Sequence, residues 1–305
     1  MERDNGSEQV FPSGLGLPDR PELPYFAYGL FQPHELAHRQ LEPLGPHSRP
    51  ASVKGFLRTR DGVPILFVGG DGSVRGWLVE FPPIEGYSIV SALEPRKLYQ
   101  WAEVEVVGEL TLANVLVGRT QLGSQFLHDD HWSGREDAVF THGISAIRTV
   151  ASQDGQAPFG SVPPAAMEWA RFFRIQMGYL LLQSAMERYL ALSYGPDLEP
   201  GQKVRKLGND PSFARHLNET VITARRVHES RGRGSAVLDP RNPNRSAKYF
   251  YVIRSNLSHR GKGAWQEAEM VRSALHDLLA IFSGMLRDAG FNQMTAEPQA
   301  EEETP

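Results

Sequence analysis

The spacing of apolar residues changes part-way along the chain. From residue 23 to about residue 110 the apolar residues form short runs separated by glycine, which is typical of β-strands. Beyond residue 165 they recur at i, i+3 and i+4, which is typical of amphipathic helices. We therefore expect an α+β protein with a β-rich N-terminal domain followed by an all-α C-terminal domain.

The individual elements follow from these patterns. Strands are expected at 25–29, 64–69, 74–81, 86–90 and 102–107, and the glycines of 69–72 predict a hairpin turn. Helices are expected at 165–194, 213–226, 247–257 and 267–286. Residues 138–150 fit one more short helix or strand, and 230–244, rich in glycine and arginine, are expected to be a loop.

Composition sets the domain boundaries. We expect a disordered leader at 1–22, a first domain at 23–150 and a proline- and glycine-rich linker at 151–164. A second domain at 165–290 and an acidic disordered tail at 291–305 complete the chain. Two domains suit a length of 305 residues.

Charge is distributed unevenly between the two halves. Residues 1–170 carry 13 Lys and Arg against 21 Asp and Glu, whereas residues 171–290 carry 19 against 11. The basic C-terminal half favours a polyanionic partner, with RNA the first candidate. The sequence has no cysteine and no apolar run of membrane-spanning length, so we expect a cytoplasmic protein without a membrane partner.

The segment Tyr25-Phe26-Ala27-Tyr28-Gly29 is the first candidate site. An apolar run ends at a glycine, and Pro33 suits the first turn of a following helix. A strand, a glycine turn and a helix start leave backbone N–H groups available for a ligand. Such turns are common, so the local pattern alone indicates a site only weakly.

This segment resembles the start of the γ-glutamylcyclotransferase and AIG2-like family, in which an aromatic strand runs into Tyr-Gly-Ser-Asn or Tyr-Gly-Thr-Leu. The resemblance covers residues 23–150 and continues through Val53-Lys54-Gly55-Phe56, Val74–Val79, Leu93-Glu94-Pro95, Tyr99–Val104 and Ala113–Gly118. It implies a mixed β-barrel of the γ-glutamylcyclotransferase type. Leu30 and Phe31 replace the small polar pair of the cyclotransferases, and Trp101 stands where the family usually has arginine.

The resemblance also implies the roles of particular residues. Glu94 matches the acid/base glutamate, Tyr99 matches the tyrosine of the following strand, and Tyr25, Tyr28, Gly29 and Leu30 form the substrate cradle. Cyclisation to 5-oxoproline requires a carboxylate that moves a proton. The apolar approach Ser91-Ala92-Leu93 would raise the pKa of Glu94 if the carboxyl group is buried. The alternative is that Glu94 lies in an ordinary surface turn before Pro95.

The second candidate site is the run Arg254-Ser255-Asn256-Leu257-Ser258-His259. Arginine and histidine at this spacing near the end of a bundle helix resemble the HEPN superfamily, and the resemblance covers about 165–288. The resemblance implies an HEPN-like helical bundle that forms a homodimer. It also implies one of two activities: metal-independent ribonuclease activity by Arg254 and His259, or RNA binding and regulation without cleavage. Five residues turn an ideal helix by about 500°, so the two side chains point about 140° apart.

Basic residues near this run form the expected RNA path. They are Arg231, Arg233, Arg241, Arg245, Lys248, Arg260 and Lys262. The alternative is structural: His259 caps a helix C-terminus and Arg254 pairs with a carboxylate.

Two other histidine motifs have simpler explanations. His34-Glu35-Leu36-Ala37-His38 matches a zinc-protease pattern, but Pro33 and Pro43 limit its helix to about two turns. His128-Asp129-Asp130-His131 is expected in a loop. We therefore expect no metal and no cofactor, and a small-molecule ligand at the first domain.

Three alternative functions remain. The protein is a γ-glutamyl-directed enzyme, an RNA-directed effector of toxin–antitoxin or phage-defence type with the barrel as its regulator, or a non-catalytic binding module.

Overall fold

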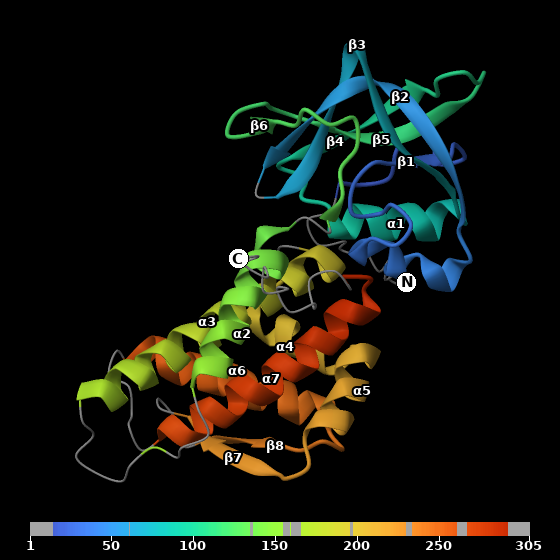
Figure 1. The fold of residues 1–305 in the computed structure, drawn as a ribbon. Helices are drawn as coiled ribbons and strands as arrows, with labels where there is room; N and C mark the ends of the chain where they lie inside the picture. The colour runs from blue at the N-terminus through green and yellow to red at the C-terminus, as the bar shows by residue number, and fades with distance from the viewer. Residues whose placement is uncertain are drawn as a thin grey trace, which may run out of the picture. The chain divides into compact units, whose positions relative to one another are not determined.

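The computed structural model describes residues 15–60, 62–134, 137–154, 159, 166–195, 198–229, 234–260 and 267–291, with the backbone alone at 166, 259 and 260. Most of the expected leader and linker, the acidic tail from residue 292, and Arg231, Arg233 and Lys262 lie outside the described residues. The chain divides into a sheet unit, Met1–Gly134 with Leu192–Asp197, and a helical unit, Arg135–Ala191 with Leu198–Pro305. The protein is α+β (Figure 1).

The sheet unit is built on one curled sheet of six strands (Figure 1). Its order is β4-β5-β1-β3-β2-β6, formed by β1 (Tyr25–Ala27), β2 (His47–Arg60), β3 (Val63–Glu80), β4 (Tyr99–Glu105), β5 (Leu112–Gly118) and β6 (Gln125–Phe126). β1 and β5 are parallel and the other neighbours are antiparallel. The sheet curls far enough for Val53 of β2 to bridge Val106, just beyond β4, so it forms half of a barrel.

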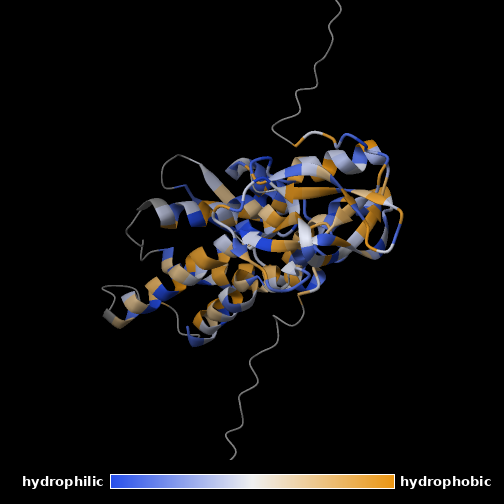
Figure 2. Cartoon of the chain, turned by 90° about the horizontal axis from the view of Figure 1, so that it is seen from above, coloured by the Kyte–Doolittle hydropathy of each residue, from blue (hydrophilic) through white to orange (hydrophobic). Residues whose placement is uncertain are grey.

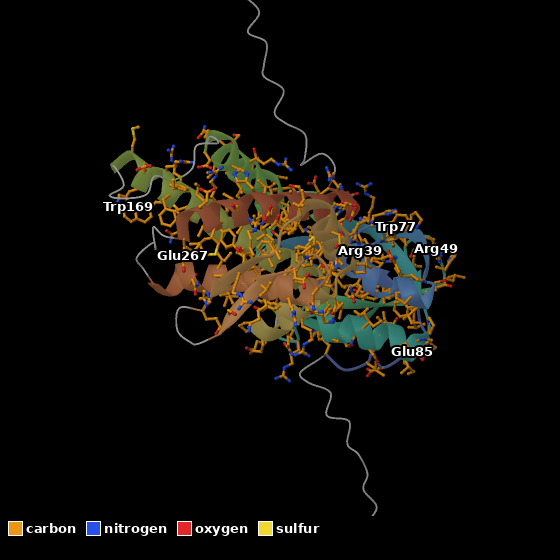
Figure 3. The ribbon with its side chains drawn as sticks, turned by 90° about the horizontal axis from the view of Figure 1, so that it is seen from below. Arg39, Arg49, Trp77, Glu85, Trp169 and Glu267 are labelled. Atoms are coloured by element: carbon orange, nitrogen blue, oxygen red, sulfur yellow. The ribbon has the colours of Figure 1, made fainter. Side chains whose placement is uncertain are left out.

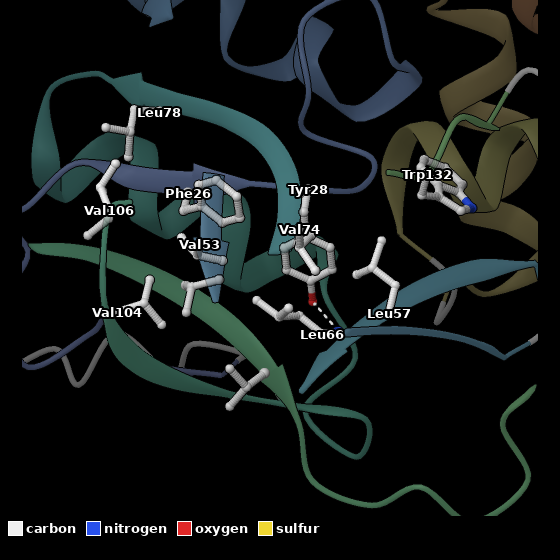
Figure 4. Packing of buried hydrophobic residues seen from close by; sticks show 13 residues of the cluster. Phe26, Tyr28, Val53, Leu57, Leu66, Val74, Leu78, Val104, Val106 and Trp132 are labelled. Atoms are coloured by element: carbon white, nitrogen blue, oxygen red, sulfur yellow. Dashed lines mark hydrogen bonds between the residues drawn. The ribbon is translucent and has the colours of Figure 1, made fainter. Parts of the chain in front are cut away.

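The curled sheet packs a separate apolar cluster on each face. Along β1, Phe26 and the following Tyr28 join the cluster of Figure 4, together with Val53, Leu66 and Val115. Tyr25 and Ala27 face the opposite cluster, which includes Tyr87 and Val90 of helix α1 (Pro83–Leu93). This alternation is the period of two that a strand imposes on its side chains.

Two sequence expectations for the sheet unit are wrong. Residues 86–90 are not a strand but the middle of α1, which begins after Pro82 with Pro83 in its first turn. Residues 69–72 are not a hairpin turn. They bulge out of β3, whose pairing with β2 shifts from Lys54↔Ser73 to Gly55↔Val68.

The segment that precedes β1 packs against the sheet unit. Residues 15–22 were expected to belong to a disordered leader, yet the Gly16 carbonyl accepts a hydrogen bond from Trp101 Nε1 at 2.9 Å. The Arg20 carbonyl accepts another from Asn114 Nδ2 at 2.7 Å.

The helical unit contains six α-helices and one hairpin among its described residues. The helices are α2 (Ile144–Gln153), which follows a π-helical turn at Val139–Gly143, α3 (Ala166–Tyr194), α4 (Pro200–Gly208), α5 (Pro211–Thr220), α6 (Pro243–Arg260) and α7 (Ala268–Asp288). The helices carry both apolar and polar residues (Figure 2). None of the described helices is both long and apolar enough to span a membrane.

The hairpin replaces parts of an expected helix and an expected loop. α5 ends at Thr220, where Val221-Ile222-Thr223 places three β-branched residues in a row, and such residues lose side-chain freedom in a helix. The chain then forms β7 (Arg225–His228), which pairs with β8 (Ser235–Leu238) inside the region expected to be a loop. The expected helix is therefore wrong beyond Thr220, and the expected loop over 230–244 is wrong at Ser235–Leu238.

One buried carboxylate joins three helices of the helical unit. The Asp154 side chain, only 1% exposed, follows α2 and lies 2.7 Å from Arg171 Nε of α3 and 2.9 Å from Arg272 Nε of α7. A buried charge that loses its partner is costly, because the remaining charges stay desolvated.

We predict that Asp154→Ala lowers the free energy of unfolding of the helical unit by about 3–5 kcal/mol. Urea denaturation followed by far-UV circular dichroism measures this. Glu229→Ala is the matched control, since Glu229 pairs at 3.4 Å with an exposed Lys248 and its loss should cost less than about 1 kcal/mol. Equal effects of the two substitutions would contradict the structural role of Asp154.

Candidate active site around Glu94

Glu94 is positioned by the end of α1. It is the C-terminal cap of this helix, with an extended backbone (φ −95°, ψ 133°) and its N–H donating to the Val90 carbonyl at 3.1 Å. Pro95 explains the change of direction, because a residue before proline is sterically driven out of the helical conformation. The glutamate therefore leaves the helix axis and turns toward the sheet.

The structure places Glu94 in one pocket with all the predicted cradle residues. The pocket is lined by Tyr25, Tyr28, Gly29, Leu30, Val63, Pro64, Glu94, Tyr99 and Leu116. These residues come from β1, from the turn after it, from the starts of β3 and β4, and from β5. Residues up to 91 positions apart in the sequence thus surround one carboxyl group.

Pro64 lies so close to Gly29 that the pocket leaves little room for a larger side chain at this position. A Cβ added at Gly29 would lie 2.9 Å from Pro64 Cγ, closer than ordinary van der Waals contact. The turn is closed by the Gln32 N–H, which donates to the Gly29 carbonyl at 3.0 Å. Within the described residues, the N–H groups of Gly29 and Leu30 themselves enter no hydrogen bond, so they remain available to a ligand.

Two of the three tyrosines are fixed by the fold. The Tyr28 hydroxyl donates to the Leu116 carbonyl at 2.6 Å. It accepts from the Leu66 N–H at 3.2 Å, the bond drawn as a dashed line in Figure 4. The Tyr99 hydroxyl donates to the Pro64 carbonyl at 2.7 Å. Among the described residues the Tyr25 hydroxyl has no hydrogen-bond partner, which makes it the tyrosine that can donate to a bound molecule.

Burial dominates the electrostatics of this pocket. It raises the pKa of Glu94 to about 8, and no ion pair or hydrogen bond within the described part of the chain offsets it. The pKa of Tyr25 and that of Tyr99 are raised well above 10, first by burial and then by the Glu94 charge. A carboxyl group with a pKa near neutrality can both accept and donate a proton, as acid–base catalysis requires.

The pocket is narrow in this conformation. The space open to a water-sized sphere is about 10 Å³, roughly enough for one water molecule. Gly29, Leu30, Val63 and Glu94 are each partly exposed as whole residues, whereas the Glu94 carboxyl group itself and the tyrosines are buried. A larger ligand therefore enters only when this exposed side opens.

Phe31 and Trp101, two residues that differ from the pattern quoted in the sequence analysis, pack against neighbouring aromatic rings. Phe31 is 1% exposed and contacts Tyr25 edge to face at 6.1 Å between ring centroids, so it belongs to the core and not to the pocket. Trp101 packs edge to face on Tyr87 at 5.4 Å and on Tyr25 at 6.0 Å. Of the two substituted loop positions, Leu30 alone lines the pocket.

The second predicted site is only partly described. Arg254 Nη2 lies 3.3 Å from Glu187 Oε1 of α3, which is the carboxylate pairing that the sequence left open as an alternative. His259 and Arg260 lie on the last turn of α6, where the structure describes their backbone alone, so it does not show whether Arg254 and His259 meet. Arg245 and Lys248 are exposed near the start of α6.

The histidine motifs have structural partners. His38 lies in a short 3₁₀ helix, Leu36–Gln40, and its Nδ1 is 2.9 Å from the Phe31 carbonyl. The Glu35 carboxylate, just before this helix, accepts from the Gly134 N–H at 3.2 Å. Asp130 forms two bonds with Arg75, at 2.6 and 2.7 Å. A search of the described residues finds no group of three His, Asp or Glu side chains able to hold a metal ion.

Comparison of the chain with protein-family models, with curated proteins and with solved structures finds no match. The two resemblances therefore rest on the quoted residues alone. Sequence reasoning missed Pro64 and Leu116 as pocket walls, because no local pattern indicates which apolar residues approach a carboxyl group. It also missed a larger cavity in the helical unit.

We predict that the burial of Glu94 makes the sheet unit less stable as the pH rises. The folded pKa lies above the unfolded value of 4.5, so between pH 4.5 and pH 8 the folded state binds more protons than the unfolded state. The loss of stability is absent below pH 4.5 and complete above pH 8. At ~1.4 kcal/mol per pKa unit it amounts to a few kcal/mol. Glu94→Gln should therefore stabilise the unit at pH 8.5 and change little at pH 4.5.

Urea unfolding followed by tryptophan fluorescence at several pH values measures this difference. Glu85→Gln is the control, since Glu85 is exposed on the same helix (Figure 3). If Glu94→Gln and Glu85→Gln shifted stability equally at every pH, the carboxyl group of Glu94 would not be buried.

Proposed function

We propose that the sheet unit is a γ-glutamylcyclotransferase-like domain that acts on a γ-glutamyl amine or dipeptide, with Glu94 as the acid/base residue. The observation that supports this most directly is the unpaired Glu94 carboxyl group, with its pKa of about 8, in a pocket with Tyr25 and the Gly29–Leu30 turn. Structural carboxylates are normally paired or exposed, whereas catalytic ones combine burial with access to a ligand.

The reaction balances with the groups present. The α-amine of the γ-glutamyl group attacks its own γ-carbonyl carbon, forming the ring C–N bond, and the bond from this carbon to the leaving amine breaks. The Glu94 carboxylate takes a proton from the attacking nitrogen and delivers it to the leaving nitrogen. The products are 5-oxoproline and the free amine.

The remaining groups of the pocket suit the charges of this substrate. The free N–H groups of Gly29 and Leu30 can donate to the developing negative charge on the carbonyl oxygen or to the substrate carboxylate. The Tyr25 hydroxyl is the third donor. Tyr28 and Tyr99 hold the pocket in shape through β3 and β5.

We predict that Glu94→Gln lowers the rate of 5-oxoproline release at least ~100-fold, because general acid–base catalysis contributes 10²–10⁴-fold. Below pH 8 the parent rate should rise about tenfold per pH unit as the carboxylate forms. Mass spectrometry of products from a panel of γ-glutamyl dipeptides and amines measures both, with Glu85→Gln as the matched control.

Two outcomes would contradict the proposal. One is a Glu94→Gln variant as active as the parent. The other is a folded parent protein that releases no 5-oxoproline from any member of the panel across pH 6–9.

RNA binding by an HEPN-like helical unit is the second candidate function. It is supported by the excess of basic residues over 171–290 and by the exposed Arg241, Arg245 and Lys248 at the start of α6. Arg254 is engaged with Glu187, which favours binding over cleavage in the conformation described. Cleavage would need a homodimer that brings together Arg254 and His259 of two copies.

We predict that RNA binding by the parent weakens with salt and that Arg245→Gln with Lys248→Gln reduces the slope of log K against log [salt] by about two. Fluorescence anisotropy with a labelled single-stranded RNA measures the slope. Glu229→Gln serves as a charge control, since removing this acidic neighbour of Lys248 should not weaken binding. A parent protein without salt-dependent RNA binding would rule out this candidate.

A further inference from the structure

A cavity larger than the Glu94 pocket lies wholly within the helical unit, and Arg254 of the predicted nuclease pair is among the residues that line it. It is lined by α3, α4 and α6 and is partly open to solvent, and its space open to a water-sized sphere is about 210 Å³, against about 10 Å³ around Glu94. This space is about twenty times that around Glu94, which is the scale of a small organic molecule.

The body of the cavity is apolar. Met186 and Leu190 of α3, Val204 and Leu207 of α4, and Ala247 and Phe250 of α6 line it. Most of these side chains are buried in the helical unit, so the walls are part of its packed core. An aliphatic chain or flat ring placed there would lose contact with water, which stabilises binding by ~0.8 kcal/mol per methylene group.

The polar end of the cavity has an excess of donors. Glu187 lies between two cations, with Lys203 Nζ at 2.8 Å from one carboxylate oxygen and Arg254 Nη2 at 3.3 Å from the other. A guanidinium has five N–H donors and an ammonium three. Within the described residues Glu187 is the only hydrogen-bond or ion-pair partner of either cation, so most of these donors have no protein acceptor.

The charge at this end is complementary to an anion. Two positive groups and one negative group line it, and all three are about a quarter to a third exposed, hence accessible from outside. The group already seated between the two cations is a carboxylate. A second carboxylate with the same planar geometry fits the unused edge of the Arg254 fork.

From these observations we propose that the cavity between α3, α4 and α6 binds an amphipathic carboxylate, an apolar chain or ring of about seven to nine carbons whose carboxylate pairs with Arg254 and Lys203. The ligand shares Arg254 with Glu187, so its binding loosens the Glu187–Arg254 pair. This site is independent of the Glu94 pocket, and the failure of either proposal leaves the other untouched.

Isothermal titration calorimetry of the full chain with octanoate tests the site. We expect butyrate and octan-1-ol to bind at least tenfold more weakly than octanoate, since the first lacks the chain and the second the charge. Arg254→Gln should lower the affinity for octanoate at least tenfold and change the affinity for octan-1-ol by no more than about twofold. The reason is that hydrogen bonds to a charged group contribute about 10–100-fold to affinity. Val204→Phe, which fills the cavity, should weaken both.

The controls separate the site from general effects of charge and folding. Arg245→Gln removes a cation from the same helix outside the cavity and should leave octanoate affinity unchanged. Lys203→Gln provides a second cation variant if thermal unfolding shows that Arg254→Gln is misfolded. The proposal is wrong if the parent does not bind octanoate, or if folded Arg254→Gln and Lys203→Gln both bind it as tightly as the parent.

Discussion

The Tyr28 hydroxyl holds the strands around Glu94 together. It accepts from the Leu66 N–H of β3 and donates to the Leu116 carbonyl of β5, and its ring packs in the cluster on one face of the sheet. Both bonds are buried, so a missing partner would leave a backbone group desolvated without compensation. β1 lies between β3 and β5 and has only three residues, so the Tyr28 hydroxyl also helps to fix the distance between β3 and β5. The pocket walls at Pro64 and Leu116 follow from this distance.

Glu94 is the element of the pocket that stability alone does not explain. The carboxyl group gains no ion pair in return for its burial, and a glutamine there would fold at lower cost above neutral pH. Folds generally pay such a cost at functional sites, where the perturbed group does chemistry or binds a ligand. The same reasoning does not apply to Asp154, whose two arginines account for its burial.

The sequence was sufficient for the class of the fold and for most residues that line the Glu94 pocket. The change from short apolar runs broken by glycine to apolar residues at i, i+3 and i+4 located the α+β organisation, and the long helix expected at 165–194 agrees with α3. The failures have local causes. In 86–90, Tyr-Ser-Ile-Val resembles a strand, but Pro83 before it and Pro95 after it bound a helix that tertiary packing of Tyr87 and Val90 stabilises. The hairpin β7-β8 was missed because the glycines and arginines of 230–234 concealed the four-residue strand that follows them.

Pairings between distant residues were beyond the reach of sequence reasoning. The helices expected from the sequence do not include Pro200–Gly208, and the sequence gives Glu187 and Lys203 no partner. The packing of α3, α4 and α6 brings both to Arg254. The motif that suggested a nuclease residue therefore yields, in three dimensions, a guanidinium already engaged with a carboxylate at the edge of an apolar cavity. An arginine in this position recognises carboxylates as readily as phosphates. An RNA phosphate and a carboxylate in the cavity would therefore compete for the same guanidinium.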